Sequence, residues 1–104
     1  MLVYGVACGW ARYRQCGDHV WEDLQEDFCT WFNTLDAARA AFNSEVAELA
    51  DVYKIERATA GACWQEKRPY VSLDVYSRGG HEWQTDPEYL ETDACVVFTP
   101  EKGL

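Results

Sequence analysis

The stretch TLDAARAAFNSEVAELA, residues 34–50, decides the fold. Its apolar side chains recur at the spacing of one helix face, as Leu35, Ala38, Phe42, Val46 and Leu49. Asn33 or Thr34 is placed to cap the helix, and Asp36 lies in the first turn, where the helix dipole favours a carboxylate. A helix with one apolar stripe must bury it against another layer, so the remainder of the chain is expected to form a sheet.

Strands are expected on both sides of this helix. Residues 2–14 alternate a bulky face with a bare one that includes Gly5, Ala7 and Gly9. A bare face lets another backbone or a helix approach closely. Further strands are expected at 52–60, 70–76 and 94–99, with a loop at 61–69.

Pro87 stands at the first position of a short helical turn predicted near 86–91. The predicted fold class is therefore α+β, an antiparallel sheet packed against one main helix at 34–50, with a short second helix near 86–91. The length of 104 residues suits a single domain.

Residues 19–32 fit two structures. As a helix, Val20, Trp21, Leu24 and Phe28 fall within an arc of about 120°. As a strand, residues 27–32 have the right β-formers, and the Gly17-Asp18 pair would supply a hairpin turn. The strand is slightly favoured for 27–32, because a first strand needs a partner.

Composition excludes several classes of protein. Hydrophobic residues make up 48% of the chain, which argues against disorder. The net charge of −9 argues against direct binding to nucleic acid or to an anionic membrane. No basic segment precedes the apolar N-terminus, so no signal peptide is expected, and five cysteines suggest reduced thiols in a cytosol.

The sequence contains only weak candidates for a metal site or a catalytic site. Cys16 and His19 have a spacing seen in zinc sites, but zinc normally needs a second such pair. Cys16 and His19, or His81 and Glu82, are also the local arrangements that resemble a catalytic pair. With two histidines in the chain, we expect no enzyme, no metal site and no cofactor.

Acidic residues give the remaining indication of function. They form three clusters with aromatic residues between them, and their spacing on a strand or helix face is comparable with that of phosphates along a nucleic-acid strand. Such a surface suits a basic groove built for DNA or RNA. Ordinary solubility is the alternative explanation of the charge. The candidate contact residues are Glu22, Asp23, Glu26, Asp27, Glu45, Glu48, Asp51, Glu88 and Glu91, with Trp21, Trp83 and Tyr89 as aromatic contacts.

In type, the chain resembles the small acidic proteins of phages and mobile elements that inhibit CRISPR effectors or restriction enzymes. The resemblance rests on the short length, the charge and the strand–helix–strand order around residues 32–38. It implies a non-enzymatic inhibitor in the host cytosol that binds a basic nucleic-acid-processing protein. The alternative is a generic protein-interaction or homodimerising module. Such a module would use the bare strand face or the alanine-rich helix face.

Overall fold

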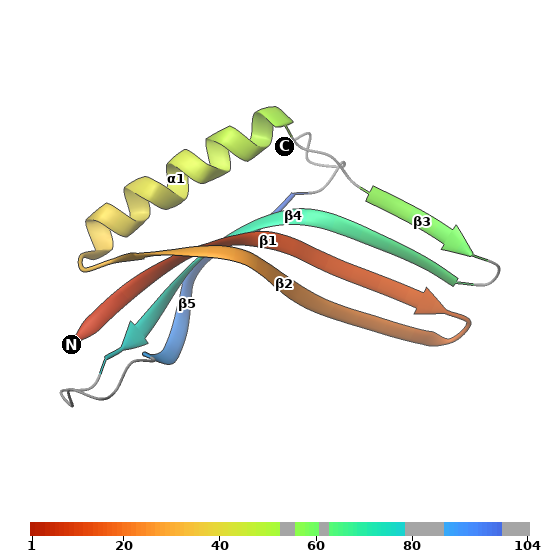
Figure 1. Ribbon diagram of the computed structural model, residues 1–104, viewed down its shortest axis with the longest axis horizontal. Helices are drawn as coiled ribbons and strands as arrows, with labels where there is room; N and C mark the ends of the chain where they lie inside the picture. The colour runs from red at the N-terminus through yellow and green to blue at the C-terminus, as the bar shows by residue number, and fades with distance from the viewer. Residues whose placement is uncertain (53–55, 61–62, 79–86, 99–104) are drawn as a thin grey trace.

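The computed structural model of the protein describes residues 1–52, 56–60, 63–78 and 87–98. These residues form five strands and one helix (Figure 1). In chain order the elements are β1 (Leu2–Cys16), β2 (His19–Phe32), α1 (Leu35–Val52), β3 (Glu56–Ala60), β4 (Cys63–Ser77) and β5 (Glu88–Val97). All strand pairs are antiparallel and α1 lies over one face of the sheet, which confirms the α+β prediction.

The sheet is long and changes composition along its length. Its strand order is β2-β1-β4-β3, and β5 also pairs with β4. β3 takes residues 63–67 of β4, whereas β5 takes residues 70–77 of the same edge. Pro69 lies between these two segments, and its carbonyl oxygen accepts a hydrogen bond of 3.0 Å from the Phe98 amide.

Two regions follow from this arrangement. The helix-covered half comprises residues 1–9, 27–52, 70–78 and 87–98. The arm comprises residues 10–26, 56–60 and 63–69, and it extends past the C-terminal end of α1 (Figure 1). The described chain is accordingly elongated, with principal extents of 52 × 30 × 17 Å.

The core lies between α1 and the sheet, as the apolar stripe predicts. Ala38 and Phe42 of α1 pack in one cluster with Val6, Cys8, Val71, Leu73 and Phe98, and Leu35, Val46 and Leu49 lie against it. Thr34 caps the helix, since its Oγ1 accepts a hydrogen bond of 3.3 Å from the Ala37 amide. The bulky face of β1 is the one that meets α1.

Residues 19–32 are a strand throughout, which settles the open choice between helix and strand. Gly17 has a φ of 59° at the turn between β1 and β2, a backbone conformation that glycine adopts readily. A bulge between Cys8 and Gly9 leaves Asp27 without a partner on β1. Gly9 is required there, because a Cβ atom would lie 1.9 Å from the Gln25 carbonyl oxygen.

The bare face of β1 is filled by its neighbours. A Cβ atom on Gly5 would lie 2.9 Å from the Cys29 sulfur and 3.2 Å from the Tyr76 ring. Ala7 is likewise buried. The expected close approach is therefore made by the side chains of β2 and β4, and Gly5 and Ala7 do not form an open docking surface.

Two predictions about secondary structure were wrong. Residues 88–91 belong to β5 and pair with residues 75–77 of β4, so the short helix near 86–91 is absent from that described part. Residues 63–69 form the first half of β4 instead of a loop. In both places pairing with a neighbouring strand overrides the local preference for a turn. Tyr53 and Ile55, expected in a strand, lie outside the described residues.

The cysteines also differ from the expectation of five reduced thiols. Cys16 and Cys63 face each other across β1 and β4 and form a disulfide at the end of the arm. Cys8, Cys29 and Cys95 are free. The described helix lacks the long apolar stretch that a membrane crossing requires.

Candidate protein-binding site

The first acidic cluster is divided between the two faces of the sheet. Glu22 and Glu26 pair with Tyr13 and Gly9, on the face turned away from α1. Asp23 is on the opposite face, and the bulge turns Asp27 toward the helix side as well. The four carboxylates therefore cannot meet one partner surface as a single row.

Asp23 is already neutralised within the chain. Its carboxylate accepts hydrogen bonds of 2.8 Å from Nε and 2.5 Å from Nη2 of Arg12, the residue directly opposite on β1. This bidentate contact lowers the pKa of Asp23 below its ordinary value. Asp23 is consequently less suited to an external cation than the sequence alone suggests.

The other predicted acids lie in two further places. Glu45, Glu48 and Asp51 follow one another along α1, with Glu45 turned toward the sheet and the other two exposed. Glu88 and Glu91 are exposed on β5, which β1 and β4 separate from β2. The structure thus brings Asp27, Glu45 and Glu48 to one region, around Cys8, and separates them from the β5 acids.

The predicted aromatic contacts are likewise dispersed. Trp21 is 52% exposed and stacks on His19, with ring centroids 5.7 Å apart. Tyr89 is exposed on β5, where it packs edge-on against Tyr76 and shares a hydrogen bond of 2.8 Å with Thr92. Trp83 lies outside the described residues.

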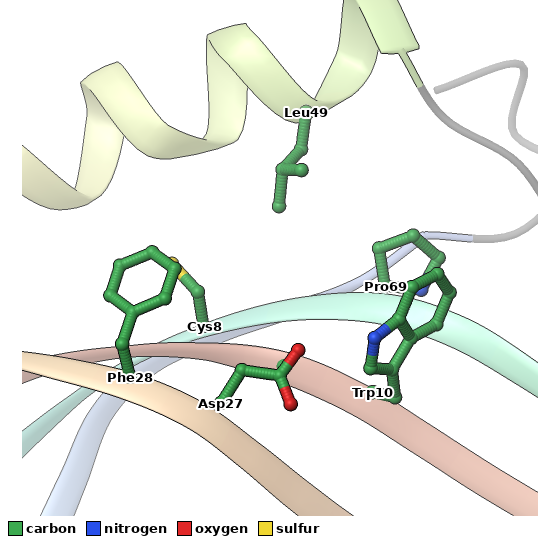
Figure 2. A pocket seen from close by; sticks show the side chains of 7 residues that line it. Cys8, Trp10, Asp27, Phe28, Leu49 and Pro69 are labelled. Atoms are coloured by element: carbon green, nitrogen blue, oxygen red, sulfur yellow. The ribbon is translucent and has the colours of Figure 1, made fainter.

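A pocket lies between the sheet and the C-terminal half of α1, next to the arm (Figure 2). Its volume is about 240 Å³. Leu49 points into it from the helix, Phe28 and Trp10 stand on opposite sides, and the Asp27 carboxylate lies between them. Cys8 and Pro69 complete the wall. The pocket therefore combines apolar walls with one carboxylate.

Further acids border this pocket. The Cys8 thiol is 3.7 Å from Oε2 of Glu45 and donates its hydrogen bond to that carboxylate. Burial, together with the charges of Glu45 and Glu48, raises the pKa of Cys8 to about 12. Cys8 is therefore a neutral thiol at pH 7 and not a nucleophile. The carboxylates of Glu45 and Glu48 place negative charge beside this wall of the pocket.

β2 is the edge strand of the sheet, and no other described strand pairs with its outer side. It exposes large apolar side chains along most of its length, namely Val20, Trp21, Leu24, Phe28 and Trp31. Unpaired edges with apolar side chains are unusual on a monomer because they invite pairing with another chain. This edge adjoins the pocket through Asp27 and Phe28.

The weak candidate pairs for catalysis and metal binding take a different form. Cys16 is held in the disulfide, so it is not a free thiol for His19, which lies opposite it in the strand register. His81 and Glu82 lie outside the described residues. Among the residues described, no group of three or more histidine, cysteine and acidic side chains is arranged to hold a metal ion.

Sequence reasoning missed Trp10, Phe28 and Pro69 as members of a site. Trp10 and Phe28 looked like core residues of a strand or helix, and Pro69 looked like the end of a loop. The bulge at Asp27 is what brings these residues together, and no residue of β2 marks the bulge by itself. Gly9 offered the one visible indication, since an isolated glycine in a strand often accompanies a bulge.

Comparison with family models, with curated proteins and with solved structures finds no match to this chain.

Proposed function

We propose that this protein is a non-enzymatic inhibitor that binds a basic, nucleic-acid-processing protein and blocks its access to DNA or RNA. The contact surface is the pocket with its bordering acids, Asp27, Glu45 and Glu48, and the exposed edge strand β2. A CRISPR effector or a restriction nuclease is the expected kind of partner, and no cofactor takes part.

The observation that carries this proposal is the exposure of β2. Five large apolar side chains, divided between the two faces of this edge strand, are exposed to water at a cost in free energy, and a protein partner that wraps around the edge removes this cost. Phe28, which lies on the same face of the sheet as the pocket, is suited to the centre of an interface, because buried aromatic contacts dominate binding free energy.

Charge favours a basic partner over other proteins. In the helix-covered half, carboxylates outnumber the two arginines, Arg39 and Arg78. The arginines are partly engaged as well, since Nε of Arg39 lies 3.5 Å from an Asp93 carboxylate oxygen. The negative field that remains would steer a basic groove toward this half. The carboxylates of this half are Asp27, Asp36, Glu45, Glu48, Asp51, Asp74, Glu88, Glu91 and Asp93.

The proposal is tested by competition with DNA. Purified CRISPR effector complexes and restriction nucleases would be mixed with labelled target DNA and increasing amounts of this protein, at low and at high salt. We expect one member of the panel to lose DNA binding at a one-to-one ratio, with an effect that weakens as salt is raised. If every panel member keeps its DNA at saturating inhibitor, the proposed class of partner is wrong.

Two matched variants locate the contact. Removing charge beside the pocket with Glu45→Gln and Glu48→Gln should weaken inhibition at least about ten-fold, because both carboxylates contribute the negative charge that would attract the partner's cations. The double variant Glu88→Gln and Glu91→Gln removes the same charge from β5 and should change inhibition little. Equal effects of the two variants would assign the activity to net charge alone.

A second copy of the chain is the alternative occupant of β2. Antiparallel pairing of two β2 edges would bring the acids of both copies, Glu22, Glu26 and Asp27, close to one another, and like charges across a strand pair are destabilising. Light scattering at high protein concentration separates the two cases. A stable dimer at physiological salt would favour the homodimer function over the inhibitor.

A further inference from the structure

We propose that the pocket between Phe28 and Trp10 binds the side chain of an arginine that the partner inserts, with the guanidinium group against the Asp27 carboxylate. This inference rests on the proposed function, in that a basic partner supplies the arginine. It adds the kind of residue recognised and the place where recognition occurs.

The walls fit the shape of this side chain. Phe28 and Trp10 stand on opposite sides of the pocket and Leu49 lies above it (Figure 2). A guanidinium group is planar, weakly hydrated and stacks on aromatic rings, so it can lie between two such walls. The three-carbon stem of arginine would occupy the apolar part beside Leu49 and Pro69.

The volume fits one side chain and not a large ligand. Sites for drug-sized ligands typically measure roughly 300–1,000 Å³. At about 240 Å³, this pocket has room for one long side chain and little more. Phe28, at 52% exposed, forms the open rim through which the side chain would enter.

The charge at the base of the pocket is free to bind a cation. Among the described residues Asp27 has no ion-pair partner, in contrast to Asp23, which Arg12 engages. Arg12 is engaged in its ion pair with Asp23 and does not neutralise Asp27. Glu45, which accepts the hydrogen bond of the Cys8 thiol, and Glu48 add negative charge at the same wall. A carboxylate between aromatic rings accepts a guanidinium group through paired hydrogen bonds.

An isolated amino acid derivative tests the pocket without any partner protein. The ¹⁵N-labelled protein would be titrated with N-acetyl-arginine amide, and the indole N–H resonance of Trp10 would be followed by NMR. The neutral isostere N-acetyl-citrulline amide is the matched ligand control, and N-acetyl-lysine amide reports the preference between cations. We expect saturable shifts at Trp10 with arginine and at least about ten-fold weaker binding of citrulline.

Variants test the assigned residues. Asp27→Asn keeps the shape of the side chain and should reduce arginine affinity at least about ten-fold. Glu88→Gln removes one charge from the distant β5 and should leave affinity within about two-fold. Phe28→Leu keeps the pocket wall apolar. Because Phe28 is exposed, this change should leave the fold intact. It should weaken arginine binding, since the aromatic ring is lost.

The opposite results would overturn the inference. These are equal binding of arginine and citrulline, an unchanged affinity in Asp27→Asn, or an effect of Glu88→Gln as large as that of Asp27→Asn. The DNA-competition assay remains independent of this titration. Inhibition without arginine binding would reject the pocket alone, whereas arginine binding without inhibition would reject the proposed partner class.

Discussion

The helix-covered half and the arm share three strands but are held together in different ways. In the covered half, α1 seals Val71, Leu73 and Phe98 so that none of the three is exposed at all. In the arm, which extends past α1, every β2 side chain from 19 to 26 is exposed. A single layer of sheet offers few buried side chains, so the arm must rely on contacts within the layer.

Those contacts in the arm are polar and cross-strand. Arg12 binds Asp23 between β1 and β2, and the Trp64 indole donates a hydrogen bond of 3.1 Å to Gln15 between β4 and β1. The Arg68 guanidinium lies 5.4 Å from the centre of the Tyr13 ring. A sheet can therefore extend beyond the hydrophobic core of the protein, provided that side-chain contacts join each strand to the next.

The largest expected effect comes from the covered half. Leu73→Ala removes a side chain with no exposed surface and should lower the free energy of unfolding by about 3 kcal/mol. Leu24→Ala in the arm removes the same atoms from a side chain that is 58% exposed and should cost less than about 0.5 kcal/mol. Urea unfolding measures both. Similar losses would contradict the division into a sealed and an unsealed region.

A smaller effect is expected from the disulfide at the end of the arm. Replacing Cys16 and Cys63 together by serine should lower the free energy of unfolding of the arm by about 2 kcal/mol, because the bond restricts the unfolded chain. Amide exchange should accelerate at residues 12–16 and 63–67 while the Val71 and Leu73 amides stay protected. Faster exchange in the covered half by the same factor would show that the two regions unfold as one unit.

The smallest effect is the acid sensitivity of the arm. Arg12 holds the pKa of Asp23 below its unfolded value of about 3.8, so the ionised pair contributes stability above that pH. The contribution is lost as pH falls through the lower, folded pKa. The stability difference between the wild type and Asp23→Asn should therefore be present at pH 6 and fade below about pH 4. A difference that is constant down to pH 2 would contradict the ion pair, and Asp51→Asn serves as an unpaired control.

Much of the covered half was predictable from the sequence. Residues 34–50 indicate the helix because their apolar period matches a helical face, and the structure confirms α1 at Leu35–Val52. The bulky face of β1 is likewise visible as an alternation. Both elements face a single core, so their patterns are simple.

The arm and the edges were harder to predict. In β2, Val20 and Leu24 lie on one face while Phe28 lies on the other, because the bulge at Asp27 reverses the alternation. In the sequence these three residues recur every four positions, a spacing that imitates a helix. Residues 88–91 follow a proline typical of a helix start, yet the free edge of β4 recruits them.

The site was predictable in its charge but not in its geometry. The acids Asp27, Glu45 and Glu48 were all candidates, and the structure gathers them near one pocket. Asp23 was also a candidate, but its pairing with Arg12 depends on strand register, which composition does not reveal. The aromatic walls depend on the same register and on the bulge.

The bond between Cys16 and Cys63 joins residues that are 47 apart in the sequence, so β2, α1 and β3 all lie within one covalent ring. A protease that cuts the chain once inside this ring opens it without releasing a fragment. The cut protein would migrate at its full mass in a gel without reductant and would separate into two pieces only after reduction. Both strands that flank the pocket, β1 and β2, would thus stay tethered after such a cut.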